Sequence, residues 1–139
     1  MELFDLKITN GTVANATETF HADIGIKDGL ITTIGKNIGD AKKEIDAVGK
    51  LVLPGGIEAH CHIEQESSGG VMTSDDYYSG SVSAAFGGNT CLIPFAAQHR
   101  GQKLQDVLEL YHSRAKPKSV IDYSFHLIIS DPTDEVIND

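Results

Sequence analysis

The feature that most constrains this chain is the sequence LVLPGGIEAHCHI at residues 51–63. In it, an apolar run is followed by two glycines and then by two histidines. If residues 57–63 form a strand, successive side chains point to opposite faces, so His60 and His62 share one face and Cys61 points to the other. Two imidazoles about 7 Å apart along a strand can hold one zinc or similar divalent ion. The spacing alone leaves open a second interpretation, in which both histidines are solvated or hydrogen-bonded near a turn.

The charge balance excludes one class of partner. The 139 residues carry 11 Lys and Arg against 20 Asp and Glu, a net charge of −9, so a nucleic-acid backbone would be repelled. No apolar run approaches the roughly 18 residues of a membrane-spanning helix, and the first residues lack the pattern of a signal peptide. Cys61 and Cys91 lie in expected strands, which favours buried thiols in a reducing compartment. We therefore expect a cytoplasmic protein that binds neither nucleic acid nor membranes.

The first 54 residues show the pattern of short strands joined by tight turns. Apolar and polar residues alternate around an Asn-Gly pair at 10–11 and an Asp-Gly pair at 28–29, and both dipeptides favour two-residue hairpin turns. Three strand–turn–strand segments are predicted, over residues 3–14, 22–35 and 44–54. We expect this part of the chain to form a small antiparallel β unit.

After Pro54 the pattern changes to apolar strands that alternate with helices, which is the signature of βαβ units and a parallel sheet. Strands are predicted over residues 57–63, 89–97 and 120–130, and helices over residues 73–86 and 104–115, with a further helix from residue 131. Asp75 and Asp76 resemble a pair of catalytic acids, but carboxylates at the start of a helix more simply stabilise its dipole. The predicted fold class is α/β.

The number of βα units limits what this chain can complete. An eight-stranded barrel needs about 250 residues, and three strands in an open sheet would leave an exposed edge. We therefore expect that the chain is truncated and prone to aggregate alone.

Four motifs carry a resemblance to a known family: PGGIEAHCH at residues 54–62, TSDDYY at 73–78, AAFGGNT at 84–90 and IPFAA at 93–97. Together they resemble the amino-terminal third of the dihydropyrimidinase family, also called D-hydantoinases, in the amidohydrolase superfamily. The similarity extends over essentially the whole chain. A His-x-His pair alone is a weak signal, and its specificity here comes from the flanking motifs.

The resemblance implies a fold, a cofactor and a reaction. Residues 55–139 would be the first βα units of a (β/α)₈ TIM-type barrel, and residues 1–54 would be part of a β-sandwich. Two divalent metal ions, usually zinc, would activate water for attack on the ring of a small cyclic amide, a dihydropyrimidine or hydantoin, to give an N-carbamoyl amino acid. The family also implies a homo-oligomer, usually a tetramer.

The resemblance also assigns site residues. His60 and His62 carry over as ligands of one metal, whereas the remaining ligands and the catalytic aspartate of the family fall on later strands. The resemblance therefore implies that this chain is inactive alone. Met72 lies in a loop that borders the substrate in the family, and His99 follows the second strand on the expected catalytic rim, so both are candidate substrate-binding residues. Glu64 stands where dihydroorotases and many allantoinases carry arginine or asparagine, and its charge would repel an acidic substrate.

Three alternatives remain open at this stage. In the first, the chain is related to another cyclic amidase, such as an allantoinase or a dihydroorotase. In the second, it belongs to a non-catalytic scaffold protein that resembles the family but has lost metal ligands. In the third, it is a complete small α/β protein that binds a metal or a partner.

Overall fold

The computed structural model of the chain describes residues 3–67 and 69–138. It shows a mixed α/β chain that divides into two compact units, Met1–Pro54 and Gly55–Asp139, which we call the first unit and the second unit. Within the described residues, no helix has the length and apolar character needed to cross a membrane.

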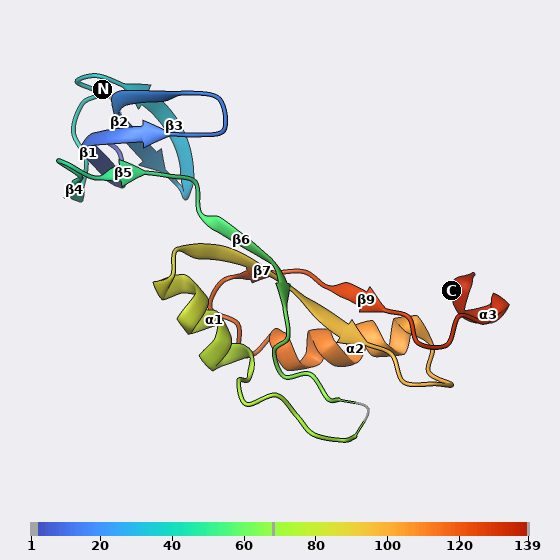
Figure 1. Cartoon of the computed structure of the whole chain (residues 1–139). Coiled ribbons are helices and arrows are strands. Elements are labelled where there is room, and N and C mark those ends of the chain that lie inside the picture. The colour runs from blue at the N-terminus through green and yellow to red at the C-terminus, as the bar shows by residue number, and fades with distance from the viewer. Residues whose placement is uncertain (1–2, 68, 139) are drawn as a thin grey trace. The chain divides into compact units, whose positions relative to one another are not determined.

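The first unit is a single sheet of five strands (Figure 1). The strands are β1 (Leu6–Ala14), β2 (Thr19–Lys27), β3 (Leu30–Gly35), β4 (Glu44–Asp46) and β5 (Leu51–Val52). β1, β2 and β3 pair in antiparallel order, whereas β4 and β5 both run parallel to β1, one after the other along its length. The prediction of a wholly antiparallel unit is therefore wrong for the last two strands.

The hairpin predicted around residues 10 and 11 is also wrong, because β1 runs straight through both positions. Asn10 takes a positive φ of 60°, and the pairing of β1 with β2 shifts between Ile8 and Gly11, which is the geometry of a β-bulge. A Cβ atom on Gly11 would lie 2.6 Å from Val52 Cγ2, so β5 needs a glycine here to approach β1. An Asn-Gly pair supplies positive φ, and a bulge uses that conformation as readily as a turn does.

The hairpin predicted around residues 28 and 29 is confirmed. β2 ends at Lys27 and pairs directly with Leu30 at the start of β3. Asp28 and Gly29 both take positive φ angles, 50° and 78°, as a type I′ turn requires.

The second unit alternates strands and helices along the chain. Its elements are β6 (Gly56–Cys61), α1 (Tyr77–Phe86), β7 (Asn89–Ala97), α2 (Leu104–Ala115), β8 (Asp122–Tyr123), β9 (His126–Ile128) and α3 (Asp134–Ile137). β6, β8 and β9 all run parallel to the central strand β7. The parallel sheet and both long helices are confirmed, but the strand predicted over residues 120–130 is split into β8 and β9.

Helix α1 begins and ends where its flanking residues predict. Asp76 is the N-cap: its Oδ1 accepts a hydrogen bond from Ser79 N at 2.9 Å, and Ser79 Oγ accepts from Asp76 N at 3.2 Å. Asp75 accepts a hydrogen bond from the Ser79 hydroxyl. At the other end, Gly88 takes a φ of 89°, which stops the helix before β7. The helix-start role expected for the two aspartates is confirmed.

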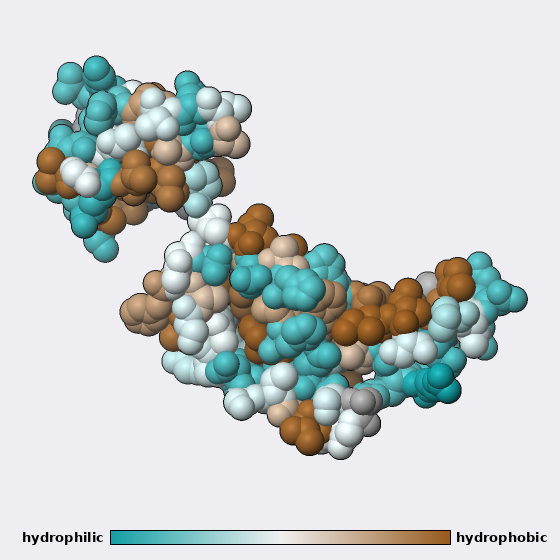
Figure 2. All heavy atoms as spheres, in the orientation of Figure 1, coloured by the Kyte–Doolittle hydropathy of each residue, from teal (hydrophilic) through white to brown (hydrophobic). Residues whose placement is uncertain are grey.

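Helices α1 and α2 cover one face of the β6–β7 sheet (Figure 1). The core beneath them is formed by Ile63, Tyr77, Leu92, Ala96, Val107, Tyr111 and Ala115. Alternate residues of β7 supply this core, and Phe95 lies between two of them in the sequence, on the face that the helices leave open. Figure 2 shows apolar side chains over β9, where Leu127 and the following Ile129 are exposed.

Candidate functional site

The two histidines of the opening motif lie at the carboxyl end of β6. His60 is within the strand and His62 is one residue beyond it, and both side chains are exposed. Their rings lie on the same face, with centroids 5.7 Å apart. Cys61, between them, packs against the helix-covered core instead. The alternation of faces that the sequence predicts is therefore confirmed, although the strand ends two residues earlier than expected.

The ring of Phe95, in β7, contacts both imidazoles. The centroid of its ring lies 4.8 Å from that of His60 and 5.0 Å from that of His62, and the His62 ring is stacked on it with only 17° between the planes. The centroid of the His126 ring, from β9, lies 5.3 Å from that of Phe95. Three histidine rings thus contact one phenylalanine on the open face of the sheet.

His62 is also held by a hydrogen bond. Its Nδ1 lies 2.7 Å from Oε1 of Gln65. Gln65 is itself fixed to Thr73, because its backbone N donates to Thr73 Oγ1 at 3.1 Å and its carbonyl accepts from Thr73 N at 3.0 Å. The His62 ring is thus constrained by a stacking contact and by a hydrogen bond.

His126 reaches across the sheet to β6. Its Nε2 lies 3.1 Å from the carbonyl oxygen of Ala59, and because a carbonyl only accepts, Nε2 carries the proton. The His126 side chain is exposed.

The two candidate substrate residues line separate, neighbouring hollows at this end of the sheet. Met72 shares an apolar hollow of about 310 Å³ with His62. His99 lines a second hollow, of about 390 Å³, whose lining also includes Ile128 at the end of β9 and Ser130 two residues later. Gln65 borders both hollows.

Glu64 does not carry the unpaired charge that was expected, because both of its carboxylate oxygens accept hydrogen bonds within the protein. Oε1 accepts from Lys118 Nζ at 2.7 Å and Oε2 accepts from the backbone N of Tyr77 at 3.1 Å. The Glu64 carbonyl accepts from Arg114 Nη1. The negative charge that was expected to repel acidic substrates is therefore paired with a cation, so this argument against a dihydroorotase loses its basis.

The thiol between the two histidines does not extend the site. Burial, together with the nearby charge of Glu58, raises the pKa of Cys61 to about 11, so it is protonated at neutral pH and is a poor metal ligand. Over the described part of the chain, no three His, Cys, Asp or Glu side chains gather closely enough to hold a metal ion. These residues offer a two-histidine portion of a site and no third ligand of those four types.

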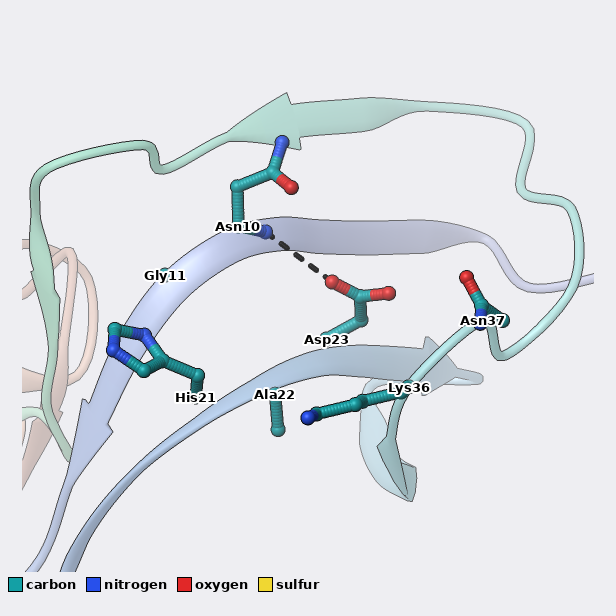
Figure 3. Close-up of a pocket in the computed structure, with 7 residues that line it drawn as sticks. All are labelled: Asn10, Gly11, His21, Ala22, Asp23, Lys36 and Asn37. Atoms are coloured by element: carbon teal, nitrogen blue, oxygen red, sulfur yellow. Dashed lines mark hydrogen bonds between the residues drawn. The ribbon is translucent and has the colours of Figure 1, made fainter.

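A different hollow, of about 450 Å³, lies in the first unit (Figure 3). His21, Asp23 and Lys36 are among its lining residues, and Asn10 donates its backbone N–H to Asp23 Oδ1. This hydrogen bond belongs to the bulge in β1, so the carboxylate supports the fold of the strand rather than facing a ligand.

Three contributors to the site were not identified from the sequence. The signal for Phe95 was present, because it alternates with core residues of β7 and so must face the histidines. Gln65 and Lys118 carry no comparable signal. Gln65 reaches His62 only because the chain bends sharply at Glu64, whose φ is 47°.

Comparisons with known proteins show what this chain is similar to. Residues 1–55 match the family described as "Urease alpha-subunit, N-terminal domain". The D-hydantoinase of Geobacillus stearothermophilus is 45% identical over 133 residues, which cover 95% of this chain and 28% of that protein. The dihydropyrimidinase of Rattus norvegicus is 35% identical over 137 residues, covering 94% of this chain and 26% of that protein.

Solved structures agree with the sequence comparison. A D-hydantoinase structure superimposes with a TM-score of 0.92 at 43% identity, covering 97% of this chain and 29% of that one. The chain thus spans less than a third of the length of these relatives. In sequence and in fold, the chain is similar to the amino-terminal part of proteins named D-hydantoinase and dihydropyrimidinase.

Proposed function

We propose that this chain supplies two metal ligands, His60 and His62, to a metal-dependent hydrolase that opens cyclic amides such as hydantoins or dihydropyrimidines. The observation that carries the proposal is the placement of both rings on one exposed face of β6, 5.7 Å apart over Phe95. Relatives that bear the same region are named for hydantoin and dihydropyrimidine substrates. The N-carbamoyl amino acid would be the product.

The donor set fits a divalent ion such as zinc. Neutral imidazoles are among the preferred zinc ligands, and the hydrogen bond to Gln65 engages Nδ1 of His62. When bound, a divalent ion lowers the pKa of water and polarises the amide carbonyl. The residues of this chain would hold the two imidazoles in place, and Phe95 would exclude water from the side of each imidazole that it contacts. The other ligands, and the second ion, would be bound by chain beyond these residues.

The fold of each unit suits this role. In the second unit, parallel strands carry helices on one face only, which is how consecutive βα units of a barrel are built, and the histidines lie at the carboxyl end, where barrel enzymes place their sites. In the first unit, the sheet has an apolar groove lined in part by Ile24, Ile31 and Leu53, as expected of one layer of a β-sandwich. We assign residues 55–139 to the start of the barrel and residues 1–54 to the sandwich.

Met72 and His99 are proposed to contact the substrate. Met72 presents an apolar side chain, 41% exposed, in the hollow beside His62, where it would meet the substituent on the ring. His99 presents a polar ring in the neighbouring hollow, where it would meet a ring amide. A cytoplasmic location and a homo-oligomer remain predictions, and the free thiols of Cys61 and Cys91 suit a reducing compartment.

A chimera tests the proposal. The 133-residue match allows this chain to replace the corresponding segment of the Geobacillus stearothermophilus D-hydantoinase. We expect the chimera to open a hydantoin ring, and His60→Asn or His62→Asn to lose both that activity and bound zinc. His112→Asn, on the exposed side of α2, is the matched control and retains both. Full activity in either His60 or His62 variant would contradict the proposal and would favour a different metal arrangement.

A further inference from the structure

We propose that Gln65 is a positioning residue that fixes the tautomer of His62 and thereby presents Nε2 of that ring to the divalent ion. The inference rests on the proposed function for the presence of the metal. The role of Gln65 is inferred from its contacts in this chain. Gln65 is adjacent to the motif but is not part of the His-x-His pair.

The hydrogen bond dictates where the proton lies. The oxygen of the Gln65 amide only accepts, and it lies 2.7 Å from His62 Nδ1, so Nδ1 must donate. A neutral imidazole has a single N–H, so Nε2 then carries the free lone pair. In the other tautomer, the lone pairs of Nδ1 and the amide oxygen would face one another at this short distance. The contact therefore selects the form of His62 that binds a metal through Nε2.

Gln65 can impose this choice because its own position is fixed. It exchanges two backbone hydrogen bonds with Thr73, through N to Thr73 Oγ1 and through its carbonyl to Thr73 N. The preceding residue, Glu64, donates its backbone N–H to the carbonyl of Asp75 at 2.9 Å. Two consecutive residues of the turn are thus tied to the segment that leads into α1.

The orientation of the His62 ring is restricted by two contacts. Stacking on Phe95, with 17° between the planes, restricts the tilt of the His62 ring, while the Gln65 oxygen restricts its rotation. Hydrogen bonds to the second nitrogen of a ligating histidine typically change metal affinity by about 10- to 100-fold. We expect a change at the lower end of this range, because the stack on Phe95 survives the loss of Gln65.

The test uses the 139-residue chain and zinc alone. Gln65→Met keeps the length of the side chain and removes the acceptor, whereas Gln65→Glu keeps an acceptor. Gln105→Met, on the exposed side of α2, is the matched control. Two-bond ¹H–¹⁵N correlation spectra identify the tautomer of each histidine without metal, and competition with a chromogenic chelator measures the zinc dissociation constant.

We expect His62 to be the Nδ1–H tautomer in the unaltered chain, in Gln65→Glu and in Gln105→Met. In Gln65→Met we expect a mixture of tautomers and a zinc dissociation constant about tenfold higher. An unchanged tautomer and zinc affinity in Gln65→Met would overturn the inference while leaving the proposed function intact. If the unaltered chain shows the expected tautomer but His62→Asn leaves zinc binding by the chimera unchanged, the proposed metal role fails, and only the effect of Gln65 on the ring stands.

Discussion

Glu64 and Lys118 lie 54 positions apart in the sequence and are joined by an ion pair of 2.7 Å. The Glu64 side chain is only 17% exposed, and its second oxygen accepts from the first backbone N–H of α1, at Tyr77. Lys118 follows α2 and also approaches Asp76, the N-cap of α1, at 3.4 Å. One carboxylate thus ties the turn after His62 to both long helices.

Removing the cation from this ion pair should destabilise the second unit. In Lys118→Met the Glu64 carboxylate loses its counter-charge but stays largely excluded from water. We expect a lower urea midpoint than for Lys116→Met, a matched change at an exposed lysine two positions away. The chain contains no tryptophan, and its four tyrosines all lie in the second unit, so tyrosine fluorescence follows the unfolding of that unit. Equal midpoints for the two variants would show that the ion pair is dispensable.

The contribution of Lys118 should also depend on pH in a defined window. The hydrogen bond to Glu64 raises the pKa of Lys118 above its ordinary value of 10.5. A raised pKa means that the folded state binds the proton more tightly, so the stabilisation is complete below 10.5 and is lost as pH rises through the raised value. The difference in urea midpoint between the unaltered chain and Lys118→Met should therefore be constant from neutral pH to about pH 10 and shrink above it. A difference that already disappears near pH 8 would contradict this assignment.

Gly55→Ala should destabilise the second unit by about 1–3 kcal/mol, because it overpacks the start of β6. A Cβ atom on Gly55 would overlap the side chain of Thr90 in β7. Gly69→Ala is the control, since its added methyl group meets only the Ser67 hydroxyl, at 3.8 Å. Urea unfolding of both variants measures the difference. An unchanged free energy of unfolding in Gly55→Ala would mean that β6 and β7 can move apart to accommodate the added methyl group.

Cys61 should react slowly with alkylating reagents. With a pKa of about 11, only about a thousandth of its thiol is ionised at pH 8, and the rate should rise about tenfold per pH unit until that pKa. Glu58→Gln removes the smaller of the two causes and should lower the pKa modestly, whereas burial remains. Iodoacetamide labelling with peptide mass analysis gives the rate at each pH. Rapid labelling of Cys61 near neutral pH would show that the thiol is not buried against the helices.

Local signals in the sequence predicted the second unit well. Asp76 caps α1 and Gly88 follows its end, so both ends of the helix were marked by residues with a strong local preference. Leu104 and Ala115 bound α2 as predicted, because the apolar residues on that helix repeat with its period. The alternation in β6 likewise placed His60 and His62 on one face.

Features that depend on contacts between distant residues were not predictable in the same way. Asn10 has the same preference for positive φ in a turn and in a bulge, and only the approach of β5 at Gly11 decides between them. The bend at Glu64 is stabilised by Lys118, a residue far along the chain, so no local pattern indicated that its carboxylate turns away from the histidines. The position of Gln65 depends on that bend.

The joint binding of one ion by His60 and His62 is the central claim, and a zinc titration followed by the ¹⁵N resonances of the histidine rings tests it most directly. We predict that the resonances of His60 and His62 shift together with a single dissociation constant, that the shift at His62 occurs at Nε2, and that both saturate at one zinc per chain. His21 and His112 should not change over the same range. Separate dissociation constants for the two rings, or equal shifts at all the histidines, would contradict the claim.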